Sequence, residues 1–216
     1  MKAIPLKITT LAPFFYYSKL TNEGYITDPF IGDIALAYAL NKVLSLENFY
    51  TEFREKPVYR EIKKLPFVFS VAKPIKYNLT PVYRRNTLFS NDGGPFIKII
   101  ENSGRLLFKN YFMIQGIKPN SIFSCFILVK NNFNIKFPLT LRIGTGRECL
   151  IKLEIEKISQ ENVWLNFYSL KNIYNVENLI SELDEYHVEF KLSNYIIFKN
   201  VPVQKFVKAF RGHFDE

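Results

Sequence analysis

The segment from Ile8 to Leu44 constrains the fold most, because it predicts a strand, a loop and a helix in direct succession. Alternation of apolar and other residues from Ile4 to Thr9 is typical of a half-buried strand, and the aromatic run Phe14–Tyr17 favours its continuation. Asn22, Glu23 and Gly24 then predict a turn.

Asp28 and Pro29 form a helix start signal, because the carboxylate can accept free backbone N–H groups and proline suits the first helical position. The sequence therefore predicts a helix from Pro29 to about Leu44. Its apolar residues cover most of the circumference and leave a water-facing stripe through Asp33, Ala37 and Asn41. A helix of this kind must be buried against a large surface, and we expect a sheet.

The same residues resemble a known family. Residues 12–40 contain the tripeptide Thr27-Asp28-Pro29 and the helix opening Ile31-Gly32-Asp33. This pattern resembles the amino-terminal signature of the type I-D form of the CRISPR-associated Cas-five family, often called Csc-one. Asp33 stands where the family pattern has Asn, and the similarity is looser in the rest of the chain.

The composition is that of a folded, basic protein. The chain has 216 residues and 48% hydrophobic content, which is enough for one domain with a sizeable core. Its formal net charge of +9 favours a polyanionic partner if the cations share one surface. Cys125 and Cys149 lie in apolar runs without metal or redox spacing, so we expect two buried, reduced thiols rather than a disulfide. No apolar run is as long as the roughly 20 residues of a membrane span, so we expect a soluble, cytoplasmic protein. We also expect no metal and no cofactor.

Residues 73–110 are expected to form a ribbon-like insertion in a single domain of residues 1–216, because turns alternate there with short strand-like pieces. Cations outnumber anions in this insertion, and aromatic residues lie among them. The cations are Lys73, Lys76, Arg84, Arg85, Lys98, Arg105 and Lys109. A solvated hairpin explains any one of them. As a group they suit a ribbon that follows phosphates while aromatic rings meet bases. The family resemblance implies that the insertion is the thumb of the subunit, which presses into the guide RNA.

Further along the chain, strands are expected at Tyr111–Ile117, Ile122–Val129, Leu139–Ile143, Cys149–Ile158 and Val163–Tyr168. A helix is expected at 176–186 with Asn175 as its cap, then a hairpin of 188–192 with 195–198, then a helix at 203–214. This order predicts an α+β fold with a ferredoxin-like core, mainly antiparallel, similar to RNA-recognition and CRISPR repeat-associated (RAMP) proteins.

A glycine-flanked turn lies between two expected strands. Gly144, Thr145 and Gly146 would let the backbone approach a ligand, and Arg142 and Arg147 could hold phosphate. A tight hairpin turn with two surface arginines is the alternative interpretation. A comparable element in the family favours contact with guide RNA.

Catalytic chemistry has weak support in the sequence. His187 and His213 are the only histidines, and neither has metal-ligand spacing. A metal-independent ribonuclease could use Tyr16, Tyr17 or Lys19 near a 2′-hydroxyl. A tyrosine pair in an aromatic-rich strand is more often a packing feature than a catalytic one, and the family resemblance implies that a separate subunit processes the guide.

The resemblance implies a non-catalytic subunit that binds the 5′ handle of CRISPR RNA (crRNA) and caps the complex backbone. It also implies contacts with the backbone subunit, with the large subunit and with target DNA near the protospacer-adjacent motif. The contact residues expected from the sequence are Tyr16, Tyr17, Lys19, Lys76, Arg84, Arg85, Arg105, Lys109, Arg142, Gly144, Thr145, Gly146 and Arg147. Two alternatives remain: a ribonuclease that processes repeat RNA, and a protein-binding scaffold without RNA contact.

Overall fold

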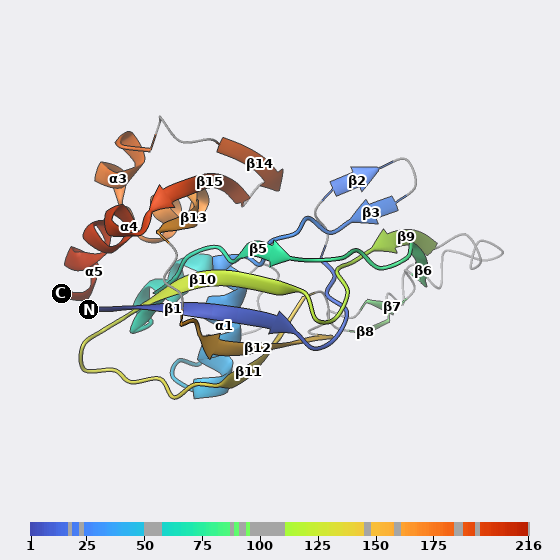
Figure 1. The fold of residues 1–216 in the computed structure, drawn as a ribbon, viewed down its shortest axis with the longest axis horizontal. Helices are drawn as coiled ribbons and strands as arrows, with labels where there is room; N and C mark the ends of the chain where they lie inside the picture. The colour runs from blue at the N-terminus through green and yellow to red at the C-terminus, as the bar shows by residue number, and fades with distance from the viewer. Residues whose placement is uncertain are drawn as a thin grey trace.

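A computed structural model of the chain describes residues 1–16, 19–21, 24–49, 58–86, 89–90, 94–95, 111–144, 148–157, 161–183, 188–192 and 195–215. A six-stranded antiparallel sheet, here called the large sheet, forms the body of the protein (Figure 1). Its strands are β1 (Lys2–Thr10), β4 (Phe67–Phe69), β5 (Lys73–Lys76), β10 (Ile122–Val129), β11 (Leu139–Ile143) and β12 (Cys149–Ile155). They lie in the order β11-β12-β1-β10-β4, and β5 also pairs with β10.

The strand predictions for this sheet are largely correct. β10 and β11 have the predicted bounds, and β12 ends at Ile155 instead of Ile158. β1 pairs with β10 from Lys2 opposite Val129 to Thr9 opposite Ile122. The expected mixed α+β fold with a mainly antiparallel sheet is therefore confirmed.

The aromatic run after β1 was expected to prolong the strand, and this prediction is wrong for Phe14, Phe15 and Tyr16. β1 ends at Thr10, and Phe14 makes an isolated bridge with Ile117 instead. Tyr17 lies outside the described residues.

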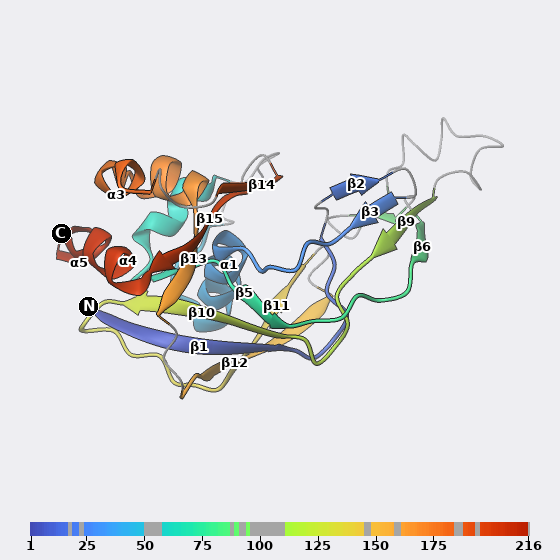
Figure 2. The ribbon, with the colours of Figure 1, turned by 45° about the horizontal axis from the view of Figure 1, so that its top comes forward.

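Helix α1 (Asp33–Leu44) crosses one face of the large sheet, as Figure 2 shows, and begins at Asp33 rather than at Pro29. The later start has a clear cause. Ile31 and Ala72 exchange backbone hydrogen bonds of 3.1 and 2.9 Å, so the chain is still extended at Ile31. Gly32, with φ −67° and ψ 141°, is the N-cap residue.

The predicted water-facing stripe of this helix is also wrong. Asp33, Ala37 and Asn41 are all buried, because the two polar side chains make specific hydrogen bonds inside the protein. The Asn41 amide donates to the carbonyl of Glu47 and accepts from its N–H, both at 2.9 Å. The Asp33 carboxylate accepts from Asn166 Nδ2 at 3.0 Å. The exposed positions are Ala35, Lys42 and Val43.

A second, small sheet projects from one end of the body (Figures 1 and 2). It contains β2 (Lys19–Thr21), β3 (Gly24–Ile26), β9 (Tyr111–Gln115) and β6 (Tyr83–Asn86), in that order. The stretch Tyr111–Ile117 was expected in the core, but β9 belongs to this small sheet and only its continuation at Ile117 enters the main core. β7 (Phe89–Ser90) and β8 (Gly94–Pro95) pair nearby, while the expected strand at 96–100 lies outside the described residues.

The C-terminal part forms a third unit on the large sheet, at the other end from the small sheet (Figure 1). It contains a three-stranded sheet of β13 (Asn162–Asn166), β15 (Tyr195–Pro202) and β14 (Val188–Leu192). Its helical elements are a π-helical turn η4 (Ser169–Ile173), α3 (Glu177–Ser181), α4 (Val203–Ala209) and α5 (Arg211–Asp215), and a 3-10 helix η1 (Tyr59–Lys64) packs beside η4.

Two helix predictions in this region need correction. In the described part of the helix expected at 176–186, the helix is α3 alone, and residues 184–186 lie outside the described residues. Its N-cap residue is Val176 instead of Asn175, which has a left-handed backbone with φ 56°. The tail is helical as predicted, with Phe206 and Phe210 buried, but it is divided into α4 and α5. Both thiols, Cys125 and Cys149, are free and buried as expected.

Candidate nucleic-acid interface

The small sheet joins the large sheet through a tight backbone junction. Phe14 and Ile117 exchange backbone hydrogen bonds of 2.9 and 2.8 Å. Thr80 holds Gly116 from the other side: its Oγ1 accepts from the Gly116 N–H at 3.0 Å, and its own N–H donates to the Gly116 carbonyl at 2.8 Å. A Cβ on Gly116 would lie 2.6 Å from the Phe14 carbonyl oxygen. Only glycine therefore fits this crossing without movement of the backbone.

Tyr16 and the Thr27-Asp28-Pro29 segment fix each other at this junction. Thr27 Oγ1 accepts from the Tyr16 N–H at 3.2 Å and donates to the Tyr16 carbonyl at 3.1 Å. The Tyr16 hydroxyl donates to the Asp28 carbonyl at 2.9 Å, and its ring packs edge-on against Phe30 with centroids 5.4 Å apart. These contacts give Tyr16 a structural role, and contact with RNA stays a prediction.

Gly144 begins the glycine-flanked turn after β11, and the fold itself explains this glycine. Its φ of +82° lies in the left-handed region. A Cβ there would lie 3.0 Å from the Phe15 carbonyl oxygen and 3.3 Å from the Phe14 ring. The close backbone approach that the sequence predicted for a ligand is made to Phe14 and Phe15. Thr145, Gly146 and Arg147 lie outside the described residues.

Strand β6 carries an exposed tyrosine and an exposed arginine on the small sheet. Tyr83 lies opposite Ile114 and Arg84 opposite Met113 in the β6–β9 pairing. Ile114 is fully buried, whereas Tyr83 is 42% exposed and Arg84 is exposed. Because neighbouring residues of a strand point to opposite faces, the ring and the guanidinium lie on different sides of the sheet. Other expected contact residues have no described side chain: Tyr17, Lys19, Arg85, Arg105 and Lys109.

The large sheet offers a second basic surface on the face opposite α1, here called the open face. The pairing aligns one row across five strands: Thr140, Lys152, Thr9, Ile122 and Lys76. Directly paired residues point to the same side, so these side chains share a face. All of them are exposed or half-buried. Arg142, two residues along β11 from Thr140, is exposed on the same face.

The open face unites only part of the predicted site. Lys76 and Arg142 share it, but they stand on strands at opposite edges, about 19 Å apart at the usual strand spacing. They cannot hold one phosphate together. Arg84 belongs to the small sheet and is a separate contact point.

Two lysines of the open face, Lys7 and Lys152, were not predicted from the sequence. They lie between the strands of Lys76 and Arg142. The alternation of β1 and β12 carried the signal, because both lysines occupy water-facing positions of strands that were predicted correctly. Glu154 lies opposite Lys7, and its Oε1 is 2.7 Å from Lys152 Nζ. The hydrogen bond from Lys152 lowers the pKa of Glu154, and the positive charges of Lys152 and Lys7 act in the same direction. Part of the positive charge of this face is thus neutralised within it.

Lys73 has a role inside the protein. Its Nζ donates to the Asn162 carbonyl at 2.7 Å and joins β5 to β13. Partial burial lowers the pKa of Lys73, while the charge of Glu156 opposes this shift. Lys73 therefore stabilises the join between the large sheet and the C-terminal unit.

A pocket of about 330 Å³ lies at the junction, between the start of β12 and the small sheet. Its lining combines rings and polar groups: Pro13, Phe15, Thr80, Tyr83, Glu148 and Cys149. Burial raises the pKa of the Cys149 thiol to about 12, so the thiol is protonated at neutral pH and is a poor nucleophile.

The described residues contain neither a metal-binding cluster nor a membrane-spanning helix. No group of three or more His, Cys, Asp or Glu side chains in this part of the chain could hold a metal ion. Over the same residues, no helix has both the length and the apolar character needed to cross a membrane. His213 lies on α5, and His187 is outside the described residues.

The architecture defines a mixed α+β protein with a mostly antiparallel sheet, a projecting small sheet and cations on its open face. A family model described as type I-D CRISPR-associated protein Cas5/Csc1 matches residues 1–209. The chain therefore belongs to the type I-D CRISPR-associated Cas5/Csc1 family, whose members are generally structural subunits of Cascade. This membership supports a role as a subunit of a CRISPR effector complex.

Among solved structures, the chain is similar to Cmr4 (Cas7) of Pyrococcus furiosus, with 13% identity and a TM-score of 0.33 over 73% of this chain and 100% of that chain. It is also similar to a chain of the type III-B Cmr-beta complex bound to cognate target RNA and AMPPnP. That match has 9% identity and a TM-score of 0.39 over 94% of this chain and 88% of the other. Both TM-scores are below 0.5, so neither likeness bears on function. No curated protein sequence gives a significant match.

Proposed function

We propose that this chain binds the 5′ handle of crRNA and caps the corresponding end of the effector-complex backbone. The observation that carries the proposal is the family match over residues 1–209. The exposed side chains of Arg84 on β6 and of Lys76 and Arg142 on the open face support it, because sequence-independent affinity for RNA comes mainly from phosphate neutralisation.

In this proposal the segment 73–110 acts as a thumb: β5 anchors its start in the large sheet, and the part after β5 reaches from the body to the RNA. β6 is the described part of that segment in the small sheet, and it presents Tyr83 and Arg84 on opposite faces. Arg84 would contact phosphate, and the ring of Tyr83, a residue that is 42% exposed, would stack on a splayed base.

The remaining body would serve as a ferredoxin-like core of β1, α1, β4, β10 and β12. In it α1 connects β1 to β4, and β10 lies between these two strands, which is a split βαβ arrangement. Within the complex, the chain would contact the backbone subunit and the large subunit, close to the target DNA that carries the protospacer-adjacent motif.

The proposed role is non-catalytic. Among the side chains named for an alternative ribonuclease activity, that of Tyr16 is described, and its hydroxyl donates to the Asp28 carbonyl. The alternative predicts that the purified chain cleaves repeat RNA without metal and that Tyr17→Phe or Lys19→Ala abolishes the cleavage. Full-length repeat RNA after prolonged incubation would support the non-catalytic role.

The RNA proposal is tested by the salt dependence of handle binding. Arg84→Gln is expected to weaken binding and to flatten the plot of log affinity against log salt by about 0.7 to 1 unit, because one phosphate contact is lost. Arg211→Gln, an exposed position on α5, is the matched control and should leave the slope unchanged. Equal slopes for Arg84→Gln and the unaltered chain would remove Arg84 from the interface.

A further inference from the structure

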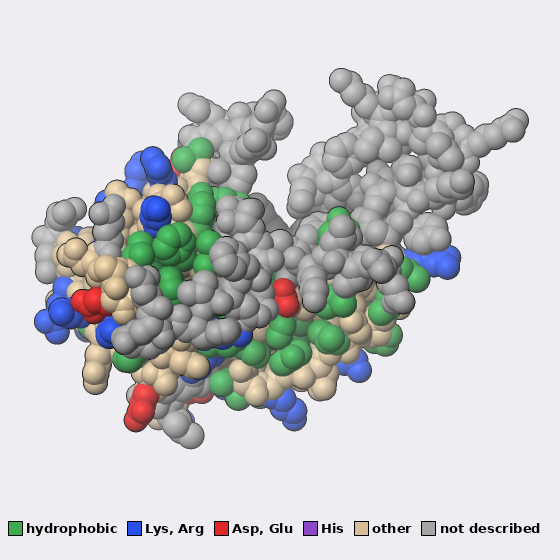
Figure 3. Space-filling view, turned by 90° about the horizontal axis from the view of Figure 1, so that it is seen from above, with side chains coloured by type: hydrophobic (Ala, Val, Ile, Leu, Met, Phe, Trp, Pro, Cys, Tyr) green, Lys and Arg blue, Asp and Glu red, His purple; other side chains and the backbone are tan. Residues whose placement is uncertain are grey.

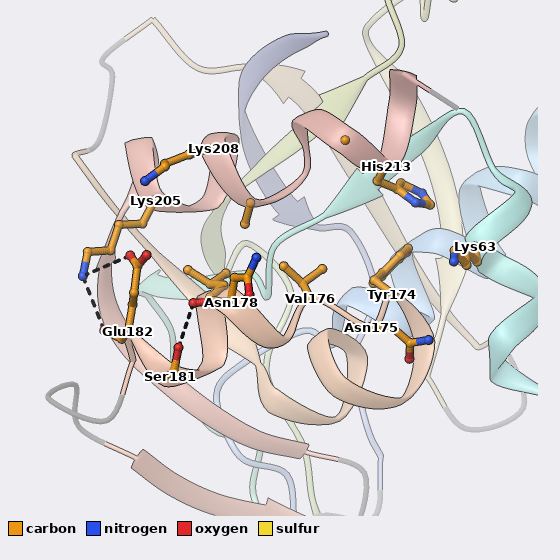
Figure 4. Close-up of a pocket in the computed structure, with 13 residues that line it drawn as sticks. Lys63, Tyr174, Asn175, Val176, Asn178, Ser181, Glu182, Lys205, Lys208 and His213 are labelled. Atoms are coloured by element: carbon orange, nitrogen blue, oxygen red, sulfur yellow. Dashed lines mark hydrogen bonds and ion pairs between the residues drawn. The ribbon is translucent and has the colours of Figure 1, made fainter.

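A polar groove of about 850 Å³ lies in the C-terminal unit, far from the small sheet. Figure 4 shows its two walls: Asn178 and Ser181 come from α3 and Glu182 directly follows it, and Lys205 and Lys208 come from α4 on the facing side. Tyr174, His213 and Lys63 line the other end. The groove is thus built from segments far apart in the sequence.

The lining is positively charged overall. Lys205 Nζ lies 3.9 Å from Glu182 Oε2 and donates to the Glu182 carbonyl at 3.4 Å, so this lysine is partly satisfied by Glu182, the residue after α3. Among the described residues, no carboxylate pairs with Lys63 or Lys208, and both are exposed. An anionic occupant would therefore find two cations available.

The uncharged part of the lining favours a peptide over RNA. The side-chain amides of Asn175 and Asn178 can both donate and accept hydrogen bonds, which matches the alternating donors and acceptors of a peptide backbone. The Ser181 hydroxyl donates to the Asn178 carbonyl at 3.1 Å, so it offers an occupant an acceptor. Base stacking requires an open aromatic face. Tyr174 is only 6% exposed, and its ring packs edge-on against Phe210 and His213.

We propose that this groove binds an acidic segment of another protein subunit of the effector complex. Charge complementarity identifies the occupant, and a second copy of this chain fits poorly because each copy carries a net charge of +9. The groove and the small sheet lie at opposite ends of the molecule (Figure 1), so this contact is independent of handle binding.

Site-specific photocrosslinking in the reconstituted complex tests the proposal. A benzophenone amino acid at position 208 should crosslink to one peptide of another subunit, and that peptide should contain more Asp and Glu than Lys and Arg. A crosslink to RNA, a crosslink to a basic or neutral peptide, or an assembled complex without any crosslink would each overturn it.

Charge reversal provides the second measurement. Lys205→Glu combined with Lys208→Glu should weaken binding of this chain to the complex that lacks it by about tenfold or more, since like charges would face each other. The single variant Lys208→Glu, at an exposed position, should act in the same direction. Lys136→Glu combined with Lys157→Glu has the same net charge and should bind normally. Equal loss in both double variants would contradict a specific acidic contact.

Discussion

Thr27 is fully enclosed at the junction, where its hydroxyl satisfies both the N–H and the carbonyl of Tyr16. Thr27→Val keeps the shape of the side chain but leaves these buried groups without a partner. We expect a loss of about 1–3 kcal/mol in the free energy of unfolding, measured by urea denaturation. Thr140→Val, at an exposed position of β11, should change it by less than about 0.5 kcal/mol. Equal midpoints for the two variants would show that the Thr27 hydroxyl does not hold the junction.

Asp33 occupies a buried position at the start of α1. Burial raises the pKa of the Asp33 carboxyl, and hydrogen bonds from Ser169 and Asn166 oppose this shift only in part. The folded protein therefore holds the proton of the Asp33 carboxyl more tightly than the unfolded chain does, where the pKa of an Asp carboxyl is about 3.9. The contribution of the Asp33 carboxyl to the free energy of unfolding is fully present below the unfolded pKa and is lost as the pH rises through the folded pKa.

Asp33→Asn should remove this pH-dependent loss. Its unfolding free energy, measured by urea denaturation at pH values from about 4 upward, should fall less with pH than that of the unaltered chain. Glu47→Gln, an exposed carboxylate on the following loop, is the control and should leave the pH profile intact. Parallel profiles for Asp33→Asn and the unaltered chain would contradict a raised pKa at Asp33.

At the scale of elements, local pattern was sufficient for strands that alternate and end at clear turns, such as β10 and β11. It failed where distant pairing decides the conformation. Pairing of Ile31 with Ala72 delays the start of α1, and no local signal at Pro29 could have indicated it. The small sheet joins β3 to β9, about ninety positions along the chain, so β9 was wrongly assigned to the core.

The same reasoning applies to the candidate site. Arg84 and Lys76 were predicted as contact residues from the excess of cations in residues 73–110, but the shared face of Lys76 and Arg142 required the register of five strands. The glycine-flanked turn was interpreted as a place where the backbone approaches a ligand, whereas Gly144 is needed for packing against Phe14 and Phe15. The polar residues of α1 were wrongly expected at the surface. Their hydrogen-bond partners lie in the loop after the helix and in β13, and no local pattern indicates these contacts.

Two glycines at the junction with the small sheet, Gly116 and Gly144, can be tested by substitution, with Gly212 in α5 as the control. Gly116→Ala should lower the unfolding free energy by about 1–3 kcal/mol because its Cβ would meet backbone. Gly144→Ala should lower it by about 1–2 kcal/mol because of its left-handed backbone. Gly212→Ala, with open space around the Cβ, should be neutral or gain up to about 1 kcal/mol in α5. The same order is expected for midpoints of thermal unfolding, and similar values for all three would refute the tight junction.

At the scale of the molecule, the net charge of +9 indicated a polyanionic partner but not its location. Figure 3 shows Lys and Arg side chains on several parts of the described surface rather than in one patch. The arrangement fits a subunit with separate contacts at its two ends: RNA beside the small sheet and the open face, and a protein segment at the groove of α3 and α4. Neutralising the cations of the RNA contact should therefore leave the affinity of the groove for its protein segment unchanged, and neutralising the groove lysines should leave the affinity for RNA unchanged.

The most direct test of handle binding is ultraviolet crosslinking of the purified effector complex, followed by sequencing of the RNA attached to this chain. Handle binding predicts that the crosslinked nucleotides lie in the repeat-derived 5′ end of the crRNA and that the attached peptides come from β6 or from the open face. Crosslinks confined to the spacer, or none to this chain while other subunits crosslink efficiently, would contradict it.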